Sequence, residues 1–419
     1  MLEALRNAWK IPDLRRRITF TFLMFLVFRI GSHVPVPGID PRVLQDVFDQ
    51  GNLLGFLDLF SGGALKRVSL FALSVTPYIT ASIVTQLLTI VIPRWEELAK
   101  EGEEGRKKLA QYTRYGTVIL ALIQAIGMVA WMRSAVITPN WTTYTVIVLA
   151  LATGTAFLMW LGEEITDKGI GNGISLIIFA GIVSRLPVGL GQIVSYLKVG
   201  AIGVINVVLL LMVSLAIVVA VIYVQEGERR ISVQYAKRVV GRRVYGGQST
   251  HIPLKVNQAG VIPIIFASSV LLFPGTVAQF VRHPWAQAVA RVLQVGAPLY
   301  TVLYFSLAVF FTFFYTAITF NPVEVSKNMQ KHGGFIPGIR PGRPTSDYIS
   351  RVLYRITVVG ALFIALVAVL PMFMGRLTGV EGLSFGGTGV LIVVGVALET
   401  MKQIEAHMLM RHYEGFLKK

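Results

Sequence analysis

Histidine is the first residue type to test for chemistry, because imidazole most often acts as a general base or a metal ligand. The sequence has six: His33, His251, His283, His332, His407 and His412. None lies in the middle of an apolar run, and no such run holds a Ser/His or Asp/Asp pair, so an intramembrane protease is not indicated. The glycine runs do not match GxxxxGK[ST], the phosphate-binding pattern. We therefore predict no enzyme activity, catalytic residue, metal site or cofactor.

Composition places the chain in a membrane. Of 419 residues, 54% are hydrophobic and 15% charged, and the mean hydropathy is +0.65, which predicts a polytopic membrane protein. The absence of cysteine excludes disulfides and thiol chemistry. Basic residues precede the first apolar run, and no small-residue cleavage site follows it. We interpret that run as a retained first span and not as a signal peptide.

Ten apolar segments are candidate spans. Their approximate limits are 18–34, 70–92, 115–132, 143–161, 173–183, 201–224, 259–281, 298–320, 356–374 and 387–398. With the N-terminus inside, the inner segments hold 29 of the 39 Lys and Arg residues. The positive-inside rule therefore predicts that both termini are cytoplasmic. This distribution also accounts for much of the net charge of +17.

The stretch 51–92 combines one full span with a shorter apolar piece. Leu70–Ile92 has no charge, whereas Leu53–Phe60 is too short to cross and is interrupted by Asp58. Backbone at membrane depth must be buried in protein or line a cavity, so the short piece is predicted to be half-inserted and enclosed. The alternative is an interfacial helix on the outer surface.

The fifth and tenth spans are both predicted to be short, and each opens on glycines, in GIGNGIS and FGGTGV. Five spans per half predict two inverted repeats, with the working centre at these corresponding positions. Chance similarity is the alternative. Apart from Arg29, the spans lack ionisable residues in their middles, which argues against a proton-coupled carrier. A passage lined by apolar and small polar side chains remains.

Two inner loops are long. Residues 226–257 contain short alternating runs, ISVQY and RRVY, which predict a hairpin standing off the membrane, and residues 321–351 contain the irregular GGFIPGIRPGRP. Their arginines can bind a phosphate backbone or an acidic protein face. The alternative is a solvated loop without a partner.

Several long stretches are peculiar enough to suggest a family. They are LFSGGALKRVSLFALSVTPYITASIVTQLL, KEGEEGR, QYTRYGT, MWLGEEITDKGIGNGISLIIFAGIV, YAKRVVGRRVYGGQSTHIPLKVNQAGVIPIIFASS, FNPVEVSKNM and FIPGIRPGRPT. In this order and spacing they resemble the bacterial SecY family, the central subunit of the Sec protein-translocation channel.

The resemblance implies an all-α membrane protein of ten transmembrane helices. They form two inverted five-helix halves around a central hourglass pore with a plug helix. The expected parts are a cytoplasmic N-terminus (1–17), a first half (18–198), a second half (199–400) carrying the loops 226–257 and 321–351, and a cytoplasmic tail (401–419). The plug is expected at about 53–66, formed by Leu53, Leu54, Phe56, Leu57, Leu59, Phe60, Ser61, Gly62 and Gly63.

The resemblance also assigns site residues. A pore ring is implied at Ile79, Ile83, Ile178, Ile182, Ile265 and Ile392. A lateral gate between spans two and seven is implied to be held shut by Gln86, Gln124 and Asn257. Without the resemblance, the isoleucines read as ordinary core and the amides as ordinary interhelical hydrogen bonds. Val367 on span nine is expected to face lipid.

The implied function is a protein-conducting channel that moves unfolded secretory polypeptides across the bacterial plasma membrane and releases apolar segments sideways into the lipid bilayer. Energy is expected from the SecA ATPase or a translating ribosome docked at Arg242, Arg243, Arg340 and Arg343, with ribosomal RNA as a further contact. SecE and a SecG-like subunit are expected partners, and the substrate is a secretory preprotein with its signal peptide. A secondary transporter and a lipid-embedded enzyme are the alternatives; the first needs mid-bilayer ionisable groups and the second a polar catalytic cluster.

Overall fold

The protein is described from a computed structural model. It covers residues 9–40, 43, 58, 61–200, 202–235, 238–240, 243–245, 249–280, 288, 292–293, 297–378 and 387–417. Its helices are α2 (Pro12–Gly31), α5 (Thr76–Val91), α6 (Pro93–Lys100), α7 (Glu103–Trp131), η1 (Arg133–Ala135), α8 (Trp141–Lys168), α9 (Gly173–Lys198), α10 (Val204–Glu226), α11 (Ile262–Phe280), α13 (Pro298–Thr319), α14 (Pro322–Lys331), α15 (Arg343–Thr378) and α16 (Gly387–Leu417).

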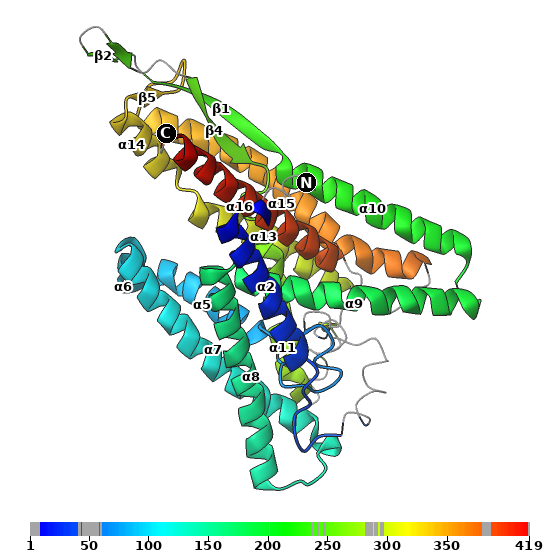
Figure 1. Cartoon of the computed structure of the whole chain (residues 1–419). Helices are drawn as coiled ribbons and strands as arrows, with labels where there is room; N and C mark the ends of the chain where they lie inside the picture. Colours follow the sequence, from blue (N-terminus) through cyan, green and yellow to red (C-terminus); the bar gives the residue numbers. More distant parts are fainter. Residues whose placement is uncertain are drawn as a thin grey trace.

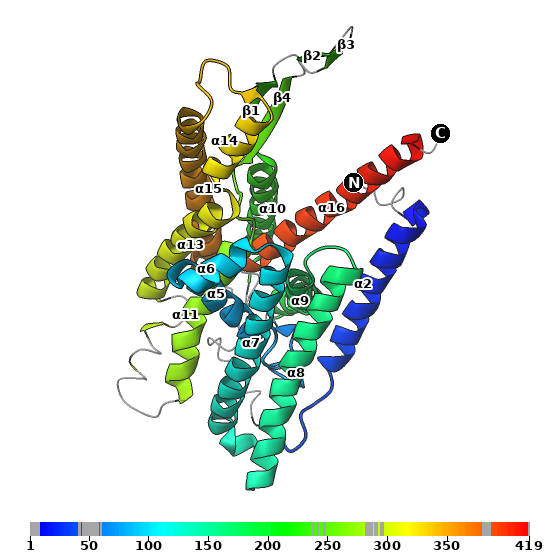
Figure 2. The same ribbon diagram turned by 90° about the vertical axis from the view of Figure 1, so that its left-hand side faces the viewer.

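Each of the ten predicted spans overlaps one long helix: α2, α5, α7, α8, α9, α10, α11, α13, α15 and α16. By length and composition alone, six described helices can cross a membrane, and a seventh span is obtained if α5 and α6 are joined across their 102° bend. Because α6 is amphiphilic and short, α5 by itself is the apolar part of that pair. Figure 2 shows α2, α7 and α8 side by side in the first half of the chain.

The helices of the two halves pack in matching pairs. In the first half α2 contacts α8 and α9, α5 contacts α7 and α8, α7 contacts α8, and α8 contacts α9. In the second half α10 contacts α15 and α16, α11 contacts α13 and α15, α13 contacts α15, and α15 contacts α16. Each of these first-half pairs has its counterpart at the corresponding position of the second half. The same pattern of helix contacts thus recurs in both halves, as two repeats of five helices predict.

The halves meet through the members that the repeat makes equivalent. Helix α5, the second span, packs against α11, the seventh, and α9, the fifth, packs against α16, the tenth. Figure 1 shows α9 running from near the middle of the molecule to its right edge, below α10. The centre of the molecule is therefore built by α5, α9, α11 and α16.

Two expectations about span length were wrong. The fifth and tenth spans were expected to be short, but α9 has 26 residues and is apolar enough to cross a membrane, and α16 has 31 residues. Span two was expected to run from Leu70, but α5 begins at Thr76, with Pro77 in its first turn. Turns occupy the preceding residues, where Val68 and Ser74 have positive φ angles of 48° and 53°.

The predicted hairpin in the first long loop is confirmed. Strand β1 (Glu228–Tyr235) pairs antiparallel with β4 (Ser249–Lys255), and β2 (Arg238–Val240) pairs with β3 (Arg243–Tyr245). Ile231 and Val233 alternate with exposed residues along β1 and are buried. The ribbon stands off the helices at one end of the molecule (Figure 1).

The second long loop is joined to the first. Strand β5 (Gly334–Phe335) adds to β1, giving the sheet order β4-β1-β5. One small core serves both loops and the helices beside them, formed by Ile231, Val233, Leu254, Met329, Ile336, Ile349 and Leu353. The two loops are therefore one structural unit, which the sequence did not predict.

Candidate functional site

The six predicted ring isoleucines lie in one buried cluster at the junction of the halves. Ile79 and Ile83 are one helical turn apart on α5, and Ile178 and Ile182 are one turn apart on α9. Ile265 comes from α11 and Ile392 from α16. Their exposures run from 0% for Ile392 to 8% for Ile79. All six belong to the same hydrophobic cluster.

A narrow point lined by such side chains has a distinct physical property. Branched aliphatic groups offer water and ions no hydrogen-bond partner, so a constriction lined by them can dry and block ion flow. They also make no directional contact with a polypeptide, whatever its sequence. The cluster can therefore seal a passage without selecting what moves through it.

Most of the predicted plug, residues 53–57, 59 and 60, lies outside the described residues. Ser61, Gly62 and Gly63 are described and buried. Gly62 and Gly63 have φ angles of +65° and +91°, which glycine adopts without strain. A Cβ on Gly62 would lie 3.0 Å from both Gly181 Cα and Ser184 Oγ of α9. The turn therefore sits directly against the wall formed by α9.

Charged side chains bind this turn to α9. The sequence analysis did not predict these contacts. Asp58 is 2% exposed and forms an ion pair with Arg185 of α9. Arg29 of α2 donates to the Gly62 carbonyl at 3.1 Å and to Ser184 Oγ at 3.2 Å. The available signal was the isolated charge of Asp58 and Arg29 in otherwise apolar segments.

The predicted lateral-gate residues lie around α5, α7 and α11, and α11 packs against both other helices. The hydrogen bonds of two of them are local: Gln86 Nε2 to Ser82 Oγ at 3.4 Å, and Asn257 Nδ2 to the Gly260 carbonyl at 2.9 Å. Gln124 is half-buried on α7. The structure brings the helices together, but the bonds of Gln86 and Asn257 do not cross between them.

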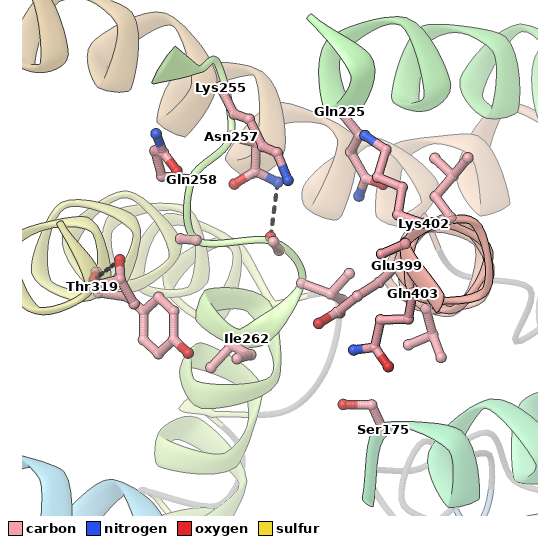
Figure 3. Close-up of a pocket in the computed structure, with 18 residues that line it drawn as sticks. Ser175, Gln225, Lys255, Asn257, Gln258, Ile262, Thr319, Glu399, Lys402 and Gln403 are labelled. Atoms are coloured by element: carbon pink, nitrogen blue, oxygen red, sulfur yellow. Dashed lines mark hydrogen bonds between the residues drawn. The ribbon is translucent and has the colours of Figure 1, made fainter. Parts of the chain in front are cut away.

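A cavity of about 390 Å³ opens beside Asn257, between the ends of several helices (Figure 3). Ser175 of α9 lines one side, and Gln225 of α10 and Glu399 of α16 line another. First- and second-half residues therefore share it. Its lining mixes amides and charges with apolar groups, in contrast to the isoleucine cluster.

The four predicted docking arginines lie on the joined loops. Arg242 lies outside the described residues, and for Arg243 only its place in β3 is described. Arg340 and Arg343 are exposed. The tip is held by Thr345 Oγ1, which donates to the Arg340 carbonyl at 2.9 Å, and by Ser326 Oγ, which donates to the Gly342 carbonyl at 2.7 Å. Arg340 therefore projects from a fixed backbone.

The family follows from a match along most of the chain. A family model described as SecY matches residues 69–401. The chain belongs to the SecY family.

Similar proteins agree with this membership. The chain is 52% identical to the protein translocase subunit SecY of Halalkalibacterium halodurans over 431 residues, covering all of both chains. A solved structure whose subject is how the SecY plug domain stabilises the closed channel and maintains a membrane seal has a TM-score of 0.65, at 18% identity, covering 94% of this chain and 92% of that one. Sec61 in a canine ribosome-channel complex has a TM-score of 0.59, at 17% identity and the same coverage.

SecY membership confirms the predicted architecture and class of function. The chain is a multi-span membrane protein with the ten-helix channel fold, and it is a channel subunit of a protein translocase, not an enzyme. One further expectation was wrong: Val367 is 3% exposed and belongs to the central cluster, so it does not face lipid. Leu366, its neighbour on α15, is 56% exposed.

Proposed function

We propose that this chain forms the pore through which unfolded secretory polypeptides cross a bacterial plasma membrane, with both termini cytoplasmic. The observation that carries the proposal is that six isoleucines from α5, α9, α11 and α16 are all buried in one larger hydrophobic cluster where the halves meet. These four helices are the second, fifth, seventh and tenth spans, which meet at the junction of the halves. The pore ring comprises Ile79, Ile83, Ile178, Ile182, Ile265 and Ile392.

The halves are proposed to be 18–198 and 199–400, between the N-terminal segment 1–17 and the tail 401–419. An exit toward lipid would open where α5 packs on α11, because this contact lies between the halves and can part while α9 and α16 still hold the halves together. Gln86, Gln124 and Asn257 would hold this seam shut. A signal peptide, itself an apolar helix, would enter there, and apolar segments of the substrate would leave there into the bilayer.

The proposed energy source is external. The joined loops present the exposed guanidinium groups of Arg340 and Arg343 on a fixed tip, which suits an acidic protein face or a phosphate backbone. SecA ATPase or a translating ribosome, including ribosomal RNA, would dock there, with Arg242 and Arg243 as further contacts. The similar Sec61 structure is part of a ribosome-channel complex, which supports the ribosome as a partner.

Helix α10 offers an exposed apolar surface on which small membrane subunits would bind. Within its most apolar stretch only 6% of residues are buried, so most of its side chains remain at least partly exposed. SecE would clamp the halves from the lipid side, and a SecG-like subunit would join the assembly.

Photocrosslinking tests the pore directly. A photoreactive amino acid at Ile79 or Ile182 should crosslink to a stalled secretory nascent chain, because both positions line the proposed constriction. The same probe at Leu366, exposed on α15, should not. Equal labelling from all three positions would overturn the proposal.

A further inference from the structure

We propose that Asp58 and Arg185 form a latch that holds the plug end against α9 and must break when the channel opens. The proposal rests on the proposed function above, because a latch has meaning only if Asp58 and the turn at residues 61–63 leave α9 during transport. Arg185 is thus assigned as a positioning residue for the closed state.

The carboxylate of Asp58 does two separate tasks. Oδ1 accepts from the backbone amide of Lys66 at 2.8 Å and from Ser61 Oγ at 3.2 Å, which fixes the turn that follows. Oδ2 pairs with the guanidinium of Arg185. One buried side chain therefore both folds the turn and joins it to α9.

A second arginine reinforces the same contact from α2. Arg29 donates to the Gly62 carbonyl and to Ser184 Oγ, while Ser184 Oγ donates to the Gly181 carbonyl at 2.7 Å. The Arg185 guanidinium lies against the same turn, 3.5–3.6 Å from where a Gly63 Cβ would stand. Two guanidinium groups thus contact the Gly62-Gly63 turn.

The charges of Asp58 and Arg185 give the closed and open states different free energies. With the turn seated, the Asp58 carboxylate compensates the half-buried Arg185. If the turn leaves, Asp58 reaches water, but Arg185 stays in the wall without this carboxylate. An uncompensated charge in a poorly solvated site is unfavourable. The pair therefore favours return of the turn to the wall.

Neutralising Arg185 tests the latch in a way that distinguishes it from general damage to the fold. In Arg185→Gln, the Asp58 charge is buried without its partner only while the turn is seated, so the closed state alone is weakened. The resting open probability in planar bilayers should rise by roughly ten- to a hundredfold. Arg185→Lys, which keeps a positive charge, should remain within about threefold of the parent. Arg133 is the exposed first residue of η1, and Arg133→Gln should match the parent.

Export of a preprotein with a defective signal sequence should follow the same order among these variants. A merely structural role for Arg185 predicts lower export of every substrate and no increase in resting conductance. Parental conductance and parental export selectivity in Arg185→Gln would overturn the latch.

A covalent latch tests the same contact without removing a charge. The chain has no cysteine, so Gly62→Cys with Ser184→Cys introduces the only two thiols. A Cβ at position 62 lies 3.0 Å from Ser184 Oγ, near enough for a disulfide, at the cost of a cysteine with positive φ.

Under oxidising conditions this double variant should insert normally but lose transport, and dithiothreitol should restore it. Full transport with the disulfide formed, as verified on a non-reducing gel, would show that the turn need not leave α9 and would overturn the proposal. Loss of transport in both redox states would instead point to damage at these positions, in which case Arg185→Gln decides. Failure of the pore proposal is separate, because it is scored by crosslinking at Ile79 and Ile182.

Discussion

Gln403 on α16 accepts a 2.9 Å hydrogen bond from the backbone amide of Gly171, in the turn just before α9. The bond joins the fifth and tenth helices, and so joins the two halves of the channel. Gly171 needs its positive φ of 87° there, and a Cβ at this position would lie 2.9 Å from Leu176 and 3.1 Å from Thr400 Oγ1. The start of α9 is thereby fixed to the C-terminal half of α16.

Gln403→Leu removes the acceptor and leaves a partly buried amide without a partner. We expect the closed assembly to lose about 1–2 kcal/mol of stability, measured as a lower Tm of the purified protein in detergent. Gln403→Glu keeps an acceptor oxygen and should stay near the parent. Identical Tm values for the leucine variant and the parent would show that this bond does not couple the halves.

Arg340→Glu should reduce motor-driven transport by about tenfold or more, because it reverses the charge on a tip that the backbone holds in place. The protein should still insert, since Arg340 is exposed and outside the helical core. The measurement is preprotein transport into reconstituted vesicles. Arg133→Glu, an exposed arginine outside the joined loops, is the control, and normal transport by Arg340→Glu would exclude the tip from docking.

Residues 53–63 make up most of the predicted plug, which we propose only occupies the passage. Deleting them should therefore leave transport intact and raise resting leak. Ala64 and Leu65 should be kept, since they are 0% and 2% exposed and belong to the cores of the helical bundle. Leak and transport are measured on the same vesicles. A deletion that stops transport while the helices stay assembled would assign a structural role to the segment.

The helices were largely predictable from sequence because a bilayer crossing needs a long uncharged run, and ten such runs overlap ten helices. The length of the fifth span was underestimated for a physical reason. Hydropathy treats each charge alone, so Arg185 ended the predicted fifth span at Val183, although α9 continues to Lys198. The cost of Arg185 is offset by Asp58, and such pairing across the chain is invisible to a local pattern.

The site was predictable only in part. The six isoleucines were named from family motifs, and the structure gathers all of them in one cluster. Helical periodicity did not determine which face of α15 points inward. Val367 was therefore predicted to face lipid, whereas the structure buries it and exposes Leu366 instead. The pairing of β5 with β1 depends on two loops distant in sequence, and a two-residue strand carries no pattern of its own.

The six ring isoleucines are proposed to form a dry, closed constriction. Ile392, fully buried on α16, is its most direct test position. An amide there gives water a hydrogen-bond partner, so Ile392→Asn should wet the constriction and conduct ions at rest. Ile392→Leu keeps volume and apolarity and should not.

Single-channel conductance of the purified complex in planar bilayers is the measurement, with Leu366→Asn on the exposed face of α15 as the control for general damage. We predict resting conductance for Ile392→Asn alone. Equal, near-zero conductance for Ile392→Asn and Ile392→Leu, with both proteins folded, would contradict the assignment of this cluster as the pore.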